Sequence, residues 1–110
     1  SGTIADGLGS SGSLTVDGAG STWTSNGYLV VGYSGAGTLS ITNGGKVSDQ
    51  YSSIGINTTS ISTVSVDGIG STWTNGGPLF IGESGIGTLH ITNGGAVTND
   101  DAYLGENAGS

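Results

Sequence analysis

The sequence predicts an all-β fold, a single-chain parallel β-helix (β-solenoid) of about four coils with about 25 residues in each coil. Three observations support this prediction: a long repeat, a second repeat of half its length, and short alternating apolar segments between glycine-rich turns. We expect the whole chain, residues 1–110, to be one solenoid segment, with double repeats of two coils at approximately 12–61 and 62–110.

The long repeat is visible by direct comparison of the two halves of the chain. VDGAGSTWT at Val16–Thr24 returns as VDGIGSTWT at Val66–Thr74. GTLSITNGG at Gly37–Gly45 returns as GTLHITNGG at Gly87–Gly95. Both pairs are offset by 50 residues, so the chain contains an internal duplication.

A shorter period of about 25 residues lies within the long one. Three columns at this spacing are wholly aliphatic and a fourth is wholly glycine: Ile4, Leu29, Ile54, Leu79, Leu104; Leu14, Leu39, Val64, Leu89; Val16, Ile41, Val66, Ile91; and Gly20, Gly45, Gly70, Gly95. In a solenoid each coil stacks on the preceding one at the spacing of paired strands, so like residues lie above like residues. The columns therefore predict a stacked aliphatic core.

Short strands and turns alternate along each unit. Leu39–Ile41 and Val64–Val66 alternate apolar and polar residues, as a strand with one buried face does. Glycine-rich clusters such as Asn43–Gly45 separate the strands and predict turns. The Asn-Gly pairs are also typical of two-residue hairpins and favour an antiparallel meander as the alternative fold. A meander gives no reason for a constant period, so we favour the solenoid.

The composition excludes several classes of function. The net charge is −7, Lys46 is the single Lys, and the chain has no Arg, so it lacks the cations that bind nucleic acids or transferring phosphoryl groups. The absence of Cys excludes disulfides and cysteine-based zinc sites. No apolar run approaches the roughly 18 residues of a membrane span, so we expect no membrane span in this segment.

No catalytic, cofactor-binding or metal-binding residue is predicted, and we do not expect an enzyme. His90 is the sole imidazole and belongs to no Ser–His–Asp motif. Asp17 and Asp67 share a column with Thr42 and Thr92, and we interpret them as turn residues that bond nearby backbone groups. A glycosidase would need two carboxylates at a defined separation, and no pair stands out.

The aromatic residues are the candidate ligand-binding positions. At a spacing of 25 residues Trp23 and Trp73 alternate with Ser48 and Thr98, and a core column should keep its volume, so this alternation predicts an outward or turn position. With Tyr28 and Phe80, the two Trp side chains could form an exposed stripe for glycans. The alternative, which the sequence favours, is that both Trp side chains cover a corner of the core.

The segments at Gly20–Val47 and Gly70–Val97 resemble a repeat of bacterial surface proteins. Both match W-x(3)-G-x-L-x-[VI]-G-x-x-G-x-G-x-L-x-I-x-N-G-G-x-V. This repeat occurs in passenger domains of type V secretion autotransporters and in proteins sorted by PEP-CTERM signals. The resemblance covers nearly the whole chain. It implies export, display at a Gram-negative cell surface and a right-handed parallel β-helix, and it brings no catalytic residues.

The function expected from these observations is structural or adhesive: a stalk or adhesin shaft of an extracellular protein displayed at the bacterial outer membrane. Two alternatives stay open. One is a fibre subunit that associates with itself end to end, since the open ends of a solenoid expose unpaired backbone groups. The other is a glycan-binding face, whose partners would be surface glycans or host and matrix components.

Overall fold

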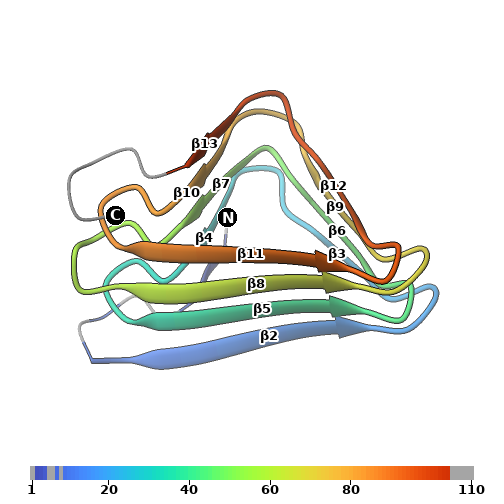
Figure 1. Cartoon of the computed structure of the whole chain (residues 1–110), viewed down its shortest axis with the longest axis horizontal. Coiled ribbons are helices and arrows are strands. Elements are labelled where there is room, and N and C mark those ends of the chain that lie inside the picture. The colour runs from blue at the N-terminus through green and yellow to red at the C-terminus, as the bar shows by residue number, and fades with distance from the viewer. Residues whose placement is uncertain (1, 5–6, 8, 105–110) are drawn as a thin grey trace.

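The computed structural model, which describes residues 2–4, 7 and 9–104, is a β-solenoid of about four coils with about 25 residues in each coil. The predicted fold class is thus confirmed. All strand pairs are parallel, and the described residues contain no helix. Each coil has the outline of a triangle whose three sides belong to three sheets (Figure 1).

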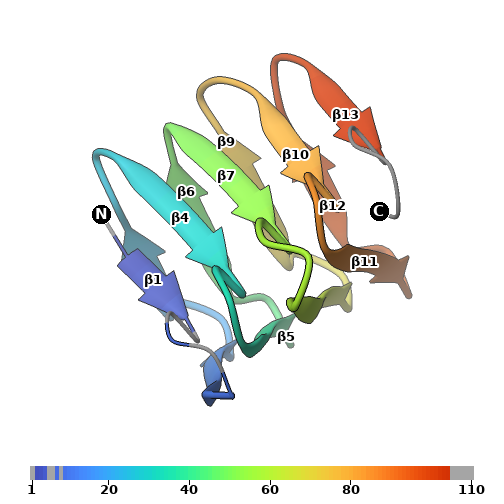
Figure 2. The same cartoon turned by 90° about the vertical axis from the view of Figure 1, so that its left-hand side faces the viewer.

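The three sheets are named here A, B and C. Sheet A comprises β1 (Gly2–Ile4), β4 (Tyr28–Val31), β7 (Tyr51–Ile54), β10 (Leu79–Ile81) and β13 (Ala102–Leu104), in that order (Figure 2). Sheet B comprises the longest strands, β2 (Ser11–Asp17), β5 (Ala36–Thr42), β8 (Ile61–Asp67) and β11 (Ile86–Thr92). Sheet C comprises β3 (Thr22–Thr24), β6 (Lys46–Asp49), β9 (Thr72–Asn75) and β12 (Ala96–Thr98). Coil 1 is β2–β3–β4, and coils 2, 3 and 4 follow with three strands each.

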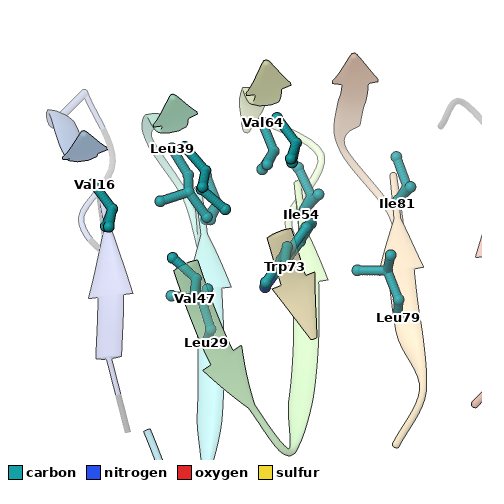
Figure 3. Packing of buried hydrophobic residues seen from close by; sticks show 12 residues of the cluster. Val16, Leu29, Leu39, Val47, Ile54, Val64, Trp73, Leu79 and Ile81 are labelled. Carbon is teal, nitrogen blue, oxygen red and sulfur yellow. The ribbon is translucent and has the colours of Figure 1, made fainter. Parts of the chain in front are cut away.

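The core is a column of apolar side chains, aliphatic apart from Trp73, that fills the triangle (Figure 3). The central strands of sheet B, β5 and β8, alternate buried and more exposed residues, as the period-2 pattern predicts. The buried apolar residues that form the cluster are Val16, Leu29, Val31, Leu39, Ile41, Val47, Ile54, Val64, Val66, Trp73, Leu79 and Ile81. All three sheets therefore contribute to one continuous core.

The register of sheet B agrees with the predicted columns. Leu39 pairs with Leu14 on one side and with Val64 on the other, and Ile41 pairs with Val16 and Val66. The spacing between paired residues is 25 throughout this sheet, so two of the three aliphatic columns are confirmed.

The predicted column through Leu29 and Leu79 is wrong. In sheet A, Ile4 pairs with Val31, Val31 with Ile54, Ile54 with Ile81 and Ile81 with Leu104, so the spacing alternates between 27 and 23 residues. Leu29 and Leu79 are both buried, but they lie beside Ser52. A constant spacing of 25 therefore gives the wrong partner in this sheet.

Unequal corners cause this alternation. Between sheets B and C, coils 1 and 3 have four residues (18–21 and 68–71), whereas coils 2 and 4 have three (43–45 and 93–95). The corner from sheet A to sheet B is longer after coil 2, at residues 55–60, than after coil 1, at residues 32–35. A corner with extra residues in one coil is balanced by a shorter corner in the next coil. The spacing between paired residues therefore stays at 25 in sheet B, whereas it alternates in sheets A and C.

The Asn-Gly pair that favoured a hairpin forms a corner of the solenoid. Asn43 has φ 51° and Gly44 has φ 90°, and the Gly45 amide donates to the Thr42 carbonyl oxygen at 3.0 Å. Positive φ at both central residues is the conformation of the two-residue hairpin turn. Here the same turn directs the chain from sheet B into sheet C, where β6 pairs with the strand of the neighbouring coil.

Backbone hydrogen bonds connect neighbouring coils at this corner as well as in the strands. The backbone amide of Lys46 donates to the Ser21 oxygen at 2.9 Å, that of Thr72 to the Gly45 oxygen at 3.0 Å, and that of Ala96 to the Ser71 oxygen at 3.0 Å.

Within the described ranges there is no helix of the length and apolarity that crossing a membrane requires.

Candidate functional site

Trp73 lies inside the core, so the prediction of a ligand-facing position is wrong for this residue. Its side chain is 0% exposed, and its indole nitrogen donates to Asp49 Oδ2 at 2.8 Å. The reason is the register of sheet C, in which Trp73 pairs with Val47 and Val97 and not with Ser48 and Thr98. A large and a smaller apolar residue thus alternate in a buried column, and the favoured alternative, a Trp that covers the core, is confirmed here.

Trp23 occupies the corresponding place in coil 1, where it pairs with Val47 and packs against the core while half-buried. With Ile4 and Leu14 it lines a hollow of about 380 Å³ at the first coil. It therefore lies apart from the two outward aromatic residues described next.

Tyr28 and Phe80 do face outward, on sheet A, as predicted. They form a ladder with Tyr51 and Tyr103, so that four consecutive coils each contribute one ring. The ring centroids are 5.2 Å apart for Tyr28 and Tyr51, 5.4 Å for Tyr51 and Phe80, and 4.8 Å for Phe80 and Tyr103. The outer face of sheet A therefore carries a continuous aromatic stripe.

Sequence reasoning missed Tyr51 because its partner lies 23 residues away. Tyr51 pairs with Tyr28, whereas the constant spacing of 25 assigns Ser53 to Tyr28. The structure shows the reason: the corner before Tyr51 is shorter than the corner before Tyr28, which moves Tyr51 into the stripe.

A groove of about 290 Å³ lies beside the stripe and is named here the tyrosine groove. Its lining includes Tyr28, Tyr33 and Tyr51, with Val30, Ile56 and Glu83. Ser53 also lines it, and the Ser53 hydroxyl is buried and has no hydrogen-bond partner. Aromatic and aliphatic walls with a few polar groups are typical of small-ligand sites, so this groove is the candidate binding site.

A second candidate feature is a polar cluster inside the corner between sheets C and A. Asp49 is almost fully buried and accepts hydrogen bonds from the Trp73 indole and from the Ser52 hydroxyl, at 2.8 and 2.7 Å. The Asn75 side-chain oxygen is a second acceptor for the single Ser52 hydroxyl proton, and the Asn75 amide nitrogen is buried without a partner. Burial raises the pKa of Asp49 above its ordinary value, although the hydrogen bonds from Trp73 and Ser52 lower it in part.

We expect Asp49→Asn to stabilise the protein at pH 7 by an amount on the order of 1 kcal/mol, the scale of one buried polar group. The raised pKa means that the native state holds the proton more tightly than the unfolded state does. The contribution of Asp49 to stability is therefore largest at low pH and is lost as the pH rises through the carboxyl range. The side-chain amide of the variant keeps an acceptor for Trp73 without carrying a charge.

Urea denaturation of the wild type and of the Asp49→Asn variant between pH 3 and pH 7 checks this prediction. The difference in the free energy of unfolding should grow in favour of the variant as the pH rises. Asp100→Asn, at an exposed carboxyl group, is the matched control and should show little difference. A variant that is less stable than the wild type at pH 7 would contradict the argument.

Asp17 and Asp67 bond the neighbouring coil, and not their own turn as expected. Asp17 Oδ1 accepts from the Thr42 hydroxyl at 2.6 Å and from the Asn43 amide at 2.7 Å, and Asp67 accepts from Thr92 and Asn93 at the same distances. These bonds lower the pKa of both carboxyl groups. The two carboxylates thus act as links between coils 1 and 2 and between coils 3 and 4.

The other polar features of the described residues are His90 and a second hollow. His90 is exposed on β11, beside Ser65. Among the residues whose positions are described, no three His, Cys, Asp or Glu side chains lie together as metal ligands would. The second hollow, of about 440 Å³, lies at the corner from sheet A to sheet B and has no aromatic wall. It is lined by Ser34, Asn57, Thr58, Thr59 and Ser84.

Comparisons of the chain with family models, with curated proteins and with solved structures gave no match.

Proposed function

We propose that the chain is a rigid structural segment, a shaft, of a protein displayed on the outside of a bacterial cell. The observation that carries this proposal is the parallel pairing of strands from coil to coil in all three sheets. Each coil uses its backbone groups to bond its neighbours, so the stack resists bending and stretching along its axis. The described fold measures 36 × 26 × 26 Å, and every added coil would lengthen it.

The location outside the cell is part of the same proposal. It is supported by the resemblance of Gly20–Val47 and Gly70–Val97 to repeats of autotransporter passenger domains and PEP-CTERM-sorted proteins. The absence of Cys also supports export, because a chain that crosses a membrane unfolded then has no thiols to cross-link. An adhesive role would follow from many weak contacts along repeated coils.

Two experiments test the shaft. Antibodies against the chain should label intact cells of the bacterium that encodes it, and protease added to those cells should remove the label. Single-molecule stretching of the chain between two marker domains should show a resisting force that drops in steps, each of which corresponds to the unfolding of one or two coils. Labelling only after lysis would overturn the location, and extension at negligible force would overturn the mechanical role.

End-to-end assembly is the second candidate, and the parallel stacking of all three sheets supports it, because such pairing can continue from one copy to the next. Val66 on β8 is fully buried, and its partner Ile91 on β11 is 48% exposed. A second copy that adds its first coil to coil 4 would bury this face and extend all three sheets in the same direction, which produces open filaments. Electron microscopy of the 110-residue chain at rising concentration should then show long unbranched filaments, and separate short particles throughout would contradict assembly.

A further inference from the structure

We propose that the tyrosine groove binds a small free organic cation of the quaternary ammonium class, with a trimethylammonium head group like that of choline. This inference is independent of the shaft proposal, because it concerns the outer face of sheet A and not the stack. It rests on the aromatic walls of the groove, on the charge around it and on the way the aromatic stripe is stacked.

The walls of the groove are aromatic rings in different orientations. The planes of Tyr28 and Tyr51 are 88° apart and their centroids are 5.2 Å apart, and Tyr33 comes from the corner that follows β4. Tyr28 and Tyr33 are 57% and 43% exposed, so a ligand can reach both rings. Rings at an angle surround a rounded head group, and their negative faces attract a cation.

The charge of the groove favours a cation over an anion. Glu83 is the charged residue of its lining, and the lining contains no Lys, Arg or His. Lys46, the single Lys of the chain, belongs to β6 in sheet C, and the net charge of the whole chain is −7. Such a field attracts cations and repels anions, including the phosphate of a phosphocholine.

The geometry of the stripe argues against a neutral glycan as the preferred ligand. A sugar stacks on the open face of an aromatic ring, but Phe80 and Tyr103 lie nearly parallel, at 12°, with centroids 4.8 Å apart. Each of these rings covers one face of the other, so this part of the stripe offers less open ring face to a sugar. The perpendicular pair at the tyrosine groove is the exception, and the groove, of about 290 Å³, suits a single small head group.

The experiment is a titration of the ¹⁵N-labelled chain by NMR with choline and with 3,3-dimethylbutan-1-ol, its uncharged analogue of the same shape. Choline should shift the NMR signals of residues around the groove. The neutral analogue should bind at least about tenfold more weakly, because it lacks the cation–π attraction. Glu83→Gln should weaken choline several-fold and leave the neutral analogue unchanged. Equal binding of the two ligands, or no shift with choline, would overturn the proposal.

Aromatic variants locate the site. Tyr33→Leu removes one aromatic wall of the groove, so it should abolish choline binding. Tyr33 lies in a corner outside the strands, so the variant should keep the dispersed NMR spectrum of the folded chain. Tyr103→Leu, in the stripe but outside the lining of the groove, is the matched control and should bind choline as the wild type does. Stronger binding of a neutral oligosaccharide than of choline would assign the face to glycans, and stronger binding of phosphatidylcholine vesicles would assign it to a membrane; either result overturns the proposal.

Discussion

Replacing Trp73 by alanine is expected to lower the free energy of unfolding by about 3–5 kcal/mol, the range for removing a buried Trp. Trp73 is the largest fully buried side chain among the described residues, and in sheet C it lies between its partners Val47 and Val97 of the two neighbouring coils. Its loss leaves a cavity across several coils, because interiors are close-packed and relax only in part. It also removes one of the two donors to the buried Asp49 carboxylate.

Urea denaturation followed by circular dichroism measures this effect. Trp23→Ala is the matched control, since Trp23 has the same place in its coil but is only half-buried, and we expect it to cost clearly less. Trp73→Phe retains most of the ring and loses the indole N–H, so it separates the loss of volume from the loss of the hydrogen bond to Asp49. Equal losses for Trp23→Ala and Trp73→Ala would show that the corner is not tightly packed.

Gly45→Ala is expected to destabilise the protein by about 2–3 kcal/mol, the upper part of the range for overpacking. A Cβ atom at this position would lie 2.3 Å from the Val16 oxygen and 2.8 Å from the Val16 carbonyl carbon. These are backbone atoms of the preceding coil, so no change of rotamer relieves the contact. The coils would have to separate at a corner where Thr72 also donates to the Gly45 oxygen.

The control for Gly45→Ala is Gly7→Ala. Nothing lies within 4 Å of a Cβ at Gly7, and its backbone is outside the left-handed region, so the change should be within about 0.5 kcal/mol. Thermal unfolding of both variants checks the pair. If Gly45→Ala melts with the wild type, the coils are less closely stacked at this corner than the structure indicates.

The glycine column shows how far the sequence alone can lead. Gly20, Gly45, Gly70 and Gly95 share a spacing of 25 residues, and the sequence predicts turns at all four. The physical reasons differ: Gly20 and Gly70 have φ of 88° and 87°, a conformation that L side chains avoid, whereas Gly45 and Gly95 have no room for a Cβ. A sequence column records that glycine is required but not which of these constraints requires it.

The same limit explains the outcome for the candidate site. The sequence predicted the fold and the register of sheet B, because both depend on a period that holds over four coils. It predicted Tyr28 and Phe80 as members of the stripe, it missed Tyr51, and it placed Trp73 beside the wrong neighbours. Side chains beyond an unequal corner shift by one or two residues, and only the three-dimensional register shows which of them meet.

The alternation of long and short corners also restricts how such a chain can change length in evolution. If a single coil were lost, two coils of the same kind would become neighbours, and Trp23 would lie above Trp73 at the spacing of paired strands, about 4.8 Å. Two indole rings would then compete for a space that now holds one indole and one valine. We expect insertions and deletions of two coils to preserve the packing, so the heritable unit of growth is 50 residues although the structural unit is about 25.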